Sequence, residues 1–362
     1  MGADRGAGAL HVPRGKLGPG CRGAAPGLTR TEVEKAVSAL LSPRVIEQEI
    51  ARIREKESNP YSAGTKTNLF TLVIIRQEGA IPPGEPDPAE IALQYMLGKR
   101  PARIITIVRV STPTTDCRVS GRCFPDKRNR GVCFEEVFIE CGDDGVGMDP
   151  GTWGPLLIRD LPVFAWVPDG LATNGGSWEA ALLKAHGLID KLLVDSARPP
   201  SGHGLAALRA VRELRERTAG AFLLSDFSWR RSRVLREQTA RAFDPPSMRP
   251  LLSSVKNVRL YGGSEFEASL FFLWLRVRLG KEIQVEHAAA GALAEGFRVT
   301  FTFTGAPDLD IGCTKGGCLS RGAEKGAYRF PTDGEILLEE VDTLSRDPVF
   351  IEVLAHAGRP DA

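Results

Sequence analysis

The segment from Phe222 to Asp244 holds the densest group of residues that could bind a partner or a ligand. It contains Trp229, Glu237 and five arginines, which are Arg230, Arg231, Arg233, Arg236 and Arg241. Tryptophan and arginine are enriched at the energetic centres of protein interfaces, and the arginine fork also matches phosphate oxygens. Three interpretations therefore stand side by side: a solvated basic helix, a protein-binding surface and a phosphate clamp.

A second chemical candidate is the pair Cys313 and Cys318, which frames a glycine-rich loop. The loop is short enough to bring two Cβ atoms into bonding range, and Lys315 favours the reactive thiolate. The spacing predicts a reversible redox pair. The alternatives are two free thiols or half of a zinc site, although a structural zinc ion usually needs four protein ligands.

The motifs of common enzyme classes are missing from the sequence. It has no phosphate-binding G-x-x-x-x-G-K-S/T loop, no strand-coupled G-x-G-x-x-G, no G-x-S-x-G and no H-E-x-x-H, and its five histidines are scattered. By these motifs the sequence offers no candidate catalytic residue, no cofactor site and no metal site. The alternative is a sugar-phosphate- or nucleotide-binding enzyme, because the Gly262-Gly263-Ser264 turn before a helix is a plausible anion site. A simple helix start, with Ser264 and Glu267 as a capping box, explains the same residues.

Composition narrows the class of protein further. The chain has 362 residues, 42% of them hydrophobic and 25% charged, and its 47 basic and 45 acidic residues leave a net charge of +2. This balance argues against a globally basic nucleic-acid binder. No apolar run approaches the roughly 20 residues that cross a bilayer, so we expect no membrane span. Seven irregularly spaced cysteines do not fit a disulfide scaffold, and we expect a cytoplasmic protein.

The elements that must position these residues follow from periodicity and helix signals. Residues 1–30 are rich in glycine and hold one acid, which predicts a disordered tail, with an arginine-rich targeting segment as the alternative. The expected strands 69–75 and 104–110 flank a helix that starts at Asp87, an arrangement typical of a βαβ unit with parallel strands. A polar loop, 111–131, should lead to a third strand, 132–141, which could return antiparallel.

The second half repeats this order of elements. We expect strands at 255–260, 283–286 and 297–303, a buried helix after Ser264 and a helix after Thr332. Between the halves we expect helices near 177–187, 204–218 and 228–243, and a short strand at 189–194. The sequence therefore predicts an α/β fold of two halves, each with a small mixed sheet in β-α-β-loop-β order. The predicted domains are a tail at 1–30, an N-terminal domain at 31–170 and a C-terminal domain at 171–357.

The Asp226–Asp244 segment resembles the signature of the glucose-6-phosphate dehydrogenase assembly protein family. The matching residues are Asp226-Phe-Ser-Trp229-Arg-Arg231, Arg236-Glu237 and Ala240-Arg-Ala-Phe243-Asp244. Further stretches agree in order, namely Thr67 to Leu69, Arg100 to Ile105, Pro155 to Ile158, Asp160 to Phe164 and Val194 to Ser196. The resemblance covers about residues 31 to 345. Leu235 and Val167 depart from it, since the family usually has tryptophan at both positions.

The resemblance implies a non-enzymatic partner of glucose-6-phosphate dehydrogenase. Such a protein binds the enzyme, favours its active oligomer and raises its activity, which supports NADPH production in the oxidative pentose phosphate pathway. We expect the contact surface in residues 226–241, with Trp229 as anchor, Arg231 and Arg236 as donors and Glu237 beside them. The alternative for Trp229 is a place in the core, and Asp226 is expected to cap a helix. Redox control through Cys313 and Cys318 is a further hypothesis.

Overall fold

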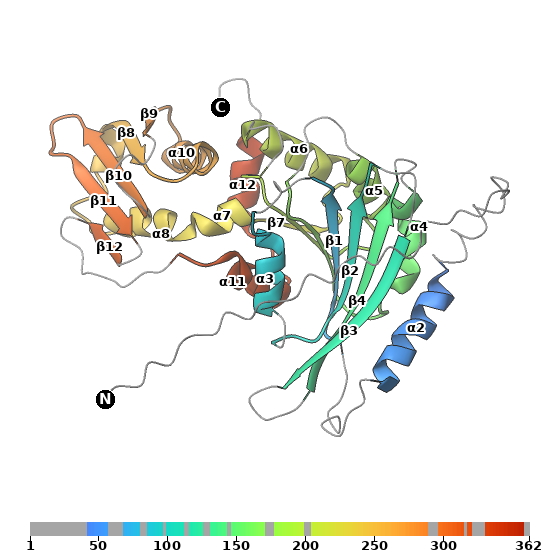
Figure 1. Ribbon diagram of the computed structural model, residues 1–362. Helices are drawn as coiled ribbons and strands as arrows, with labels where there is room; N and C mark the ends of the chain where they lie inside the picture. Colours follow the sequence, from blue (N-terminus) through green and yellow to red (C-terminus); the bar gives the residue numbers. More distant parts are fainter. Residues whose placement is uncertain are drawn as a thin grey trace, which may run out of the picture.

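A computed structural model describes residues 42–56, 68–79, 85–96, 99–111, 116–125, 131–142, 146–170, 177–198, 204–288, 296–314, 317–320 and 330–357. The described chain forms two β-sheets, each packed with helices (Figure 1). The predicted tail at 1–30 lies outside the described residues. None of the described helices has the length and apolar character needed to cross a membrane.

The first sheet has seven strands in the order β3-β4-β2-β1-β5-β6-β7. The strands are β1 (Thr71–Gln77), β2 (Arg103–Arg109), β3 (Asp116–Pro125), β4 (Gly131–Cys141), β5 (Val163–Val167), β6 (Lys191–Val194) and β7 (Leu223–Asp226). All neighbours run parallel except β3, which pairs antiparallel with β4. The strand order reverses at β1, so the sheet is doubly wound with its switch point between β1 and β5.

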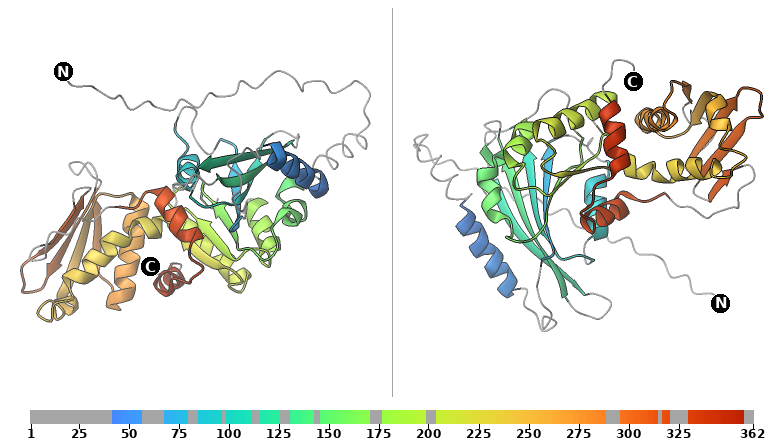
Figure 2. Two further views of the ribbon diagram at one scale, coloured as in Figure 1. Left: turned by 90° about the horizontal axis from the view of Figure 1, so that it is seen from below. Right: turned by 180° about the vertical axis from the view of Figure 1, so that it is seen from behind.

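Helices cover both faces of the first sheet. They are α2 (Pro43–Lys56), α3 (Pro88–Met96), α4 (Pro150–Trp153), α5 (Ser177–Ala185) and α6 (Gly204–Arg217), with short 3-10 turns at Val146–Met148 and Gly154–Leu156. Leu72 of β1 packs in a core with α3, whereas its neighbour Val73 packs in the core that includes α5 and α6. This alternation follows from the strand period of two, and Figures 1 and 2 show the helices on opposite sides of the sheet.

The second sheet has five strands in the order β12-β11-β10-β8-β9. They are β8 (Val255–Tyr261), β9 (Gln284–Ala288), β10 (Gly296–Phe303), β11 (Leu309–Thr314) and β12 (Gly317–Ser320). Helix α10 (Glu265–Leu279) joins the parallel pair β8 and β9, and the remaining pairs are antiparallel. The predicted capping box of Ser264 and Glu267 starts α10, and Leu270 and Phe271 are fully buried within it.

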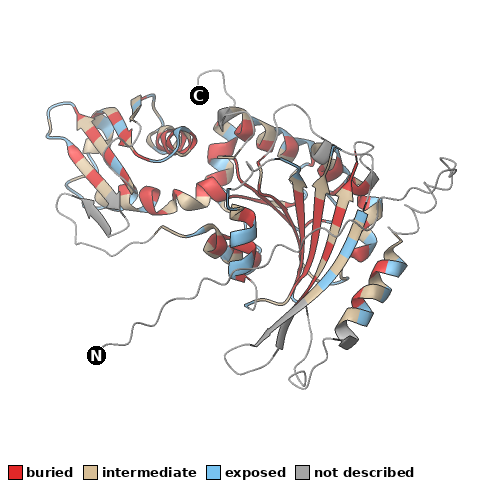
Figure 3. Cartoon of the chain, in the orientation of Figure 1, coloured by how far each residue is buried: buried red, intermediate tan, exposed pale blue. Residues whose placement is uncertain are grey.

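Helices also connect the two sheets and return the chain to the first one. The outward connection consists of α7 (Phe227–Arg231), α8 (Arg233–Ala242) and α9 (Leu251–Ser254). After the second sheet, α11 (Asp333–Val341) packs against α3, and α12 (Pro348–His356) packs against α6 and α10. Buried residues continue through these helices, from the first sheet towards the second (Figure 3).

The two sheets confirm the predicted α/β class, with differences in both halves, since β11 and β12 of the second sheet were not predicted. The loop expected at 111–131 contains the strand β3, and β4 runs parallel to β2 rather than returning antiparallel to it. The first sheet is also larger than expected, because it takes in β5, β6 and β7 as parallel strands. Strands on both sides of residue 170 therefore belong to one sheet, and the domain boundary there stays a prediction.

Candidate functional site

The candidate segment begins where β7 ends in the first sheet. Asp226 is the last residue of β7, and its Oδ1 accepts hydrogen bonds from the backbone N–H groups of Ser228 at 2.8 Å and Trp229 at 3.1 Å. These bonds confirm the prediction that Asp226 caps a helix. Its side chain is fully buried, and burial raises the pKa of the carboxyl group to about 6.

Arg231 joins the first sheet to α11. Its Nη2 lies 2.7 Å from Oδ2 of Asp195, the residue that follows β6, and its Nε lies 2.8 Å from Oδ1 of Asp333 in α11. Burial alone lowers the pKa of an arginine, but these two carboxylates hold the pKa of Arg231 above its usual value. The guanidinium group is therefore occupied by two carboxylates from distant parts of the same chain.

Trp229 lies in the core rather than on the surface. Its side chain is 2% exposed, and its indole N–H donates to Oδ2 of Asp347 at 2.8 Å. Its ring lies 5.4 Å from the ring of Phe350, centroid to centroid. Trp229 therefore occupies a place in the core, the alternative to the predicted surface anchor. The burial depends on α12, which carries Phe350 and begins directly after Asp347.

Arg236 is buried against Trp229, and Glu237 points outward. The Arg236 guanidinium carbon lies 3.1 Å from the Trp229 ring centroid, and its Nη2 donates to the Trp229 carbonyl oxygen at 2.8 Å. Its Nε and Nη1 find no hydrogen-bond partner within the described ranges, and burial lowers its pKa to about 9. The Glu237 side chain is 49% exposed, 3.7 Å from Arg233. Of the four predicted contact residues, Glu237 is the exposed one.

Neighbouring charged residues tie the same segment to α11. Arg230 pairs with Glu339 and Glu340, and its Nε lies 2.8 Å from Oε1 of Glu340. The buried Lys191, at the start of β6, lies 2.6 Å from Oε2 of the same glutamate. Sequence reasoning did not single out these acids, because they lie far along the chain from the basic residues they meet. Arg230 and Arg231 therefore form ion pairs within the molecule and do not belong to a freely solvated basic surface.

The other predicted sites are placed by the backbone. Cys313 of β11 and Cys318 of β12 lie directly opposite each other in the antiparallel register, although their side chains lie outside the description.

Gly262 and Gly263 have φ values of 85° and 72°, and a Cβ on Gly262 would lie 2.2 Å from the carbonyl oxygen of Gly296. Backbone geometry and the capping box therefore explain the Gly-Gly-Ser turn. Among the residues described, no three His, Cys, Asp or Glu side chains gather as metal ligands would.

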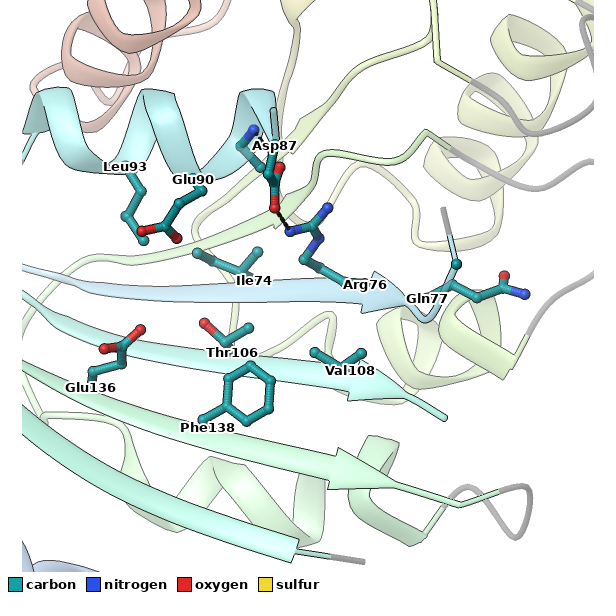
Figure 4. A pocket seen from close by; sticks show the side chains of 12 residues that line it. Ile74, Arg76, Gln77, Asp87, Glu90, Leu93, Thr106, Val108, Glu136 and Phe138 are labelled. Atoms are coloured by element: carbon teal, nitrogen blue, oxygen red, sulfur yellow. Dashed lines mark hydrogen bonds and ion pairs between the residues drawn. The ribbon is translucent and has the colours of Figure 1, made fainter. Parts of the chain in front are cut away.

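A half-open groove of about 340 Å³ lies on the first sheet beside α3 (Figure 4). The groove is lined by Ile74 of β1, Thr106 of β2 and Phe138 of β4. Glu90 of α3 and Glu136 of β4 stand on opposite sides of β1 and β2 (Figure 4). The carboxyl ends of β1 and β5 meet at the switch point, where open α/β sheets commonly bind ligands. Here Arg76 fills that point.

The Arg76 side chain is held by two carboxylates. Its Nη2 lies 2.9 Å from Oδ1 of Asp169, the second residue after β5, and its Nη1 pairs with Asp87, which precedes α3. Although burial alone lowers it, these contacts raise the pKa of Arg76 above its usual value. The guanidinium group is therefore already neutralised, and it presents no free positive charge to a phosphate.

Two models of one protein family match most of the chain. The N-terminal domain of the glucose-6-phosphate dehydrogenase subunit matches residues 95–213, and the C-terminal domain of the same family matches residues 223–354. The chain belongs to the glucose-6-phosphate dehydrogenase assembly protein family. The first match ends within α6 and the second begins at β7, so the second includes the whole Trp229 segment.

Two relatives named OxPP cycle protein OpcA match part of this assembly-family chain. The OxPP cycle protein OpcA of Nostoc punctiforme is 26% identical over 67% of this chain and 53% of its own length. The protein of the same name from a Synechocystis species is 24% identical over 49% of this chain and 37% of its own length. The chain thus spans about half, or less, of the length of the relatives it matches. The names place the family in the oxidative pentose phosphate cycle.

Solved structures of similar shape are distant from this assembly-family chain. An aldose-aldose oxidoreductase from Caulobacter crescentus is 10% identical, with a TM-score of 0.38, and the match covers 81% of this chain and 98% of that protein. A scyllo-inositol dehydrogenase from Lactobacillus casei is also 10% identical, with a TM-score of 0.35 over 80% and 94% of the two chains. At this distance the likeness carries no argument about activity.

Proposed function

We propose that the chain is a non-catalytic effector that binds glucose-6-phosphate dehydrogenase, promotes its active oligomer and raises its activity. The observation that carries the proposal is the match of two glucose-6-phosphate dehydrogenase assembly models across residues 95–213 and 223–354. Such an effector supports NADPH production in the oxidative pentose phosphate pathway. Its place of action is then wherever the dehydrogenase works, which we propose is the cytoplasm.

The physical basis of the proposed effect is differential binding. An effector shifts an enzyme towards its active oligomer only if it binds that form more tightly than the inactive one. A coupling free energy of about 1–3 kcal/mol changes the apparent affinity for a substrate by roughly 5- to 150-fold. No catalytic group on the effector is needed for a change of this size.

We propose α8 as one contact element, with the four predicted residues in two different roles. Glu237 lies on the exposed side of α8 and is the proposed contact. Trp229, Arg231 and Arg236 are positioning residues. The bonds of Trp229 and Arg231 to carboxylates of α11, α12 and the first sheet hold the α7–α8 segment in place, and Arg236 packs on the Trp229 ring. Arg233, 39% exposed and paired with Glu339, adds a charge beside Glu237.

The test is capture of the dehydrogenase by the purified chain. Tagged wild-type protein should retain glucose-6-phosphate dehydrogenase from the same organism, added in purified form. Glu237→Lys should weaken retention without changing the thermal unfolding temperature, since the side chain is exposed. Glu352→Lys, on the exposed side of α12, is the matched control. Failure of the wild-type chain to retain the enzyme would contradict the proposed function.

The alternative function is a sugar-phosphate- or nucleotide-binding enzyme. It expects a rise in the thermal unfolding temperature when such ligands are added without any partner. The N-terminal turn of α10 gives it little support, because Glu265 and Glu267 place negative charge where an anion would bind. The neutralised Arg76 at the switch point gives it little support either.

A further inference from the structure

Among the described residues that line the groove beside α3, acidic side chains outnumber basic ones. Arg76, at one end, is matched by two carboxylates, Asp87 and Asp169. Glu90 and Glu136 stand near the other end (Figure 4). Their contacts are with neutral groups: Glu90 accepts from the Gln94 amide at 3.1 Å and Glu136 from the Ser120 hydroxyl at 3.0 Å. Within the described ranges neither carboxylate pairs with a cation.

The floor between these carboxylates is largely apolar. Ile74 and Thr106 lie between the two carboxylates with the ring of Phe138 beside them, whereas Leu93 stands on α3 beside Glu90 and Val108 lies towards Arg76 (Figure 4). The guanidinium carbon of Arg118 lies 4.7 Å from the centroid of that ring, and Arg118 is paired with Glu140 at 2.6 Å. An apolar floor under two acidic walls suits a long basic side chain, whose methylene stem packs on the floor while its charged head reaches the carboxylates.

We propose that this groove receives a lysine or arginine side chain from a basic segment of the dehydrogenase. The inference rests on the proposed function and adds a second contact, distinct from α8. A volume of about 340 Å³ lies at the lower end of the range for ligand sites, which fits one or two inserted side chains rather than a nucleotide. Charge complementarity selects a basic occupant, because a phosphate would meet Glu90 and Glu136 with like charge.

The experiment measures the dissociation constant for purified dehydrogenase at low and at near-physiological salt. The test variant is Glu90→Gln with Glu136→Gln. The control is Glu213→Gln with Glu216→Gln, which removes two exposed charges from α6 and therefore changes the net charge equally. We expect the groove variant to bind about tenfold more weakly, with a shallower salt dependence, and the control to bind like the wild type.

The outcomes distinguish a failure of the groove proposal from a failure of the proposed function. If the wild-type chain binds and the groove variant binds equally well, the groove proposal is overturned and the proposed function stands. If the wild-type chain does not bind at all, the proposed function itself fails. Carbodiimide coupling, which joins a carboxylate to a nearby lysine amine, identifies the occupant by mass spectrometry. A link from Glu90 or Glu136 to a dehydrogenase lysine supports the proposal, whereas a link only to a lysine of the same chain or of a second copy overturns it.

Discussion

Arg231 and Arg236 lie five positions apart in the sequence but meet opposite electrostatic surroundings. Arg231 has a carboxylate on each side, whereas Arg236 is buried against an indole ring with two of its nitrogens unpartnered among the described residues. Arginine type and spacing identified both residues as candidates. They did not identify Asp333 as a partner of Arg231, because this acid lies about a hundred residues further along the chain. Asp226 was predictable as a cap because the N–H groups it accepts from lie within three residues.

This contrast predicts different costs for one substitution at the two arginines. Arg231→Met should lower the free energy of unfolding by about 3 kcal/mol, because it leaves the buried Asp195 with less positive charge. Arg236→Met keeps the stem in place, removes a poorly hydrogen-bonded buried charge, and should change stability by less than about 1 kcal/mol. Urea denaturation at neutral pH measures both values. An equal loss at both positions would contradict the described surroundings.

Asp226 gives a prediction that depends on pH. The pKa of its carboxyl group is about 6 in the folded chain against an ordinary value of 3.8. Between these two pH values the native state therefore keeps a proton that the unfolded chain releases. This group's contribution to stability therefore falls as pH rises from about 4 to about 6. Asp226→Asn keeps the capping oxygen and removes the charge. At pH 7 it should raise the free energy of unfolding by an amount of the order of 1–3 kcal/mol.

Denaturation curves at two pH values check this expectation. The advantage of Asp226→Asn over the wild type should disappear at pH values below the ordinary pKa of aspartate. Asp226→Ala is the control for the cap and should be about 1 kcal/mol less stable than Asp226→Asn at either pH. An advantage of the same size at both pH values would show that Asp226 does not titrate as described.

At the scale of elements, local signals predicted where the helices α10 and α11 begin, whereas the edge strand β3 was not predicted. The capping boxes at Ser264 and Thr332 start α10 and α11 as predicted, because each box lies within four residues. Strand β3 lies at the sheet edge and holds several polar residues, so its sequence resembles that of a loop. The parallel pairing of β4 with β2 depends on contacts distant in the sequence, which local patterns do not encode.

The hairpin of β11 and β12 gives a prediction about redox chemistry. Cys313 and Cys318 lie directly opposite each other in the backbone register of β11 and β12. Hydrogen peroxide should convert the two thiols into a disulfide, with water as the reduced product. Differential alkylation and mass spectrometry should find this bond, and a dithiol should reverse it.

The functional form of this prediction uses the dehydrogenase assay. Activation of the enzyme by the oxidised chain should differ from activation by the reduced chain. Replacing both cysteines with serine should remove the difference, while Cys141→Ser, at a buried thiol of the first sheet, should leave it unchanged. A difference that persists in the double variant would exclude the pair as its source.

At the scale of the whole molecule, the C-terminal helices α11 and α12 connect the parts that carry the two sheets. After the second sheet, α11 returns to α3 and supplies Asp333 to Arg231, and α12 packs beside α6 and α10. The α/β class and the strands β8, β9 and β10 of the second sheet were predictable from alternating strands and capped helices, whereas β11 and β12 were not predicted. The seven-stranded sheet was not, because it depends on which strands pair across long stretches of chain. The family match covers elements of both sheets and supports the proposed role with glucose-6-phosphate dehydrogenase.

The most direct test of the central claim is the glucose-6-phosphate saturation curve of the dehydrogenase with and without excess purified chain. If the chain binds the active oligomer preferentially, the substrate concentration at half-maximal rate should fall by roughly 5- to 150-fold, the range expected for an allosteric coupling of about 1–3 kcal/mol. Superimposable curves with the chain in excess would contradict the account.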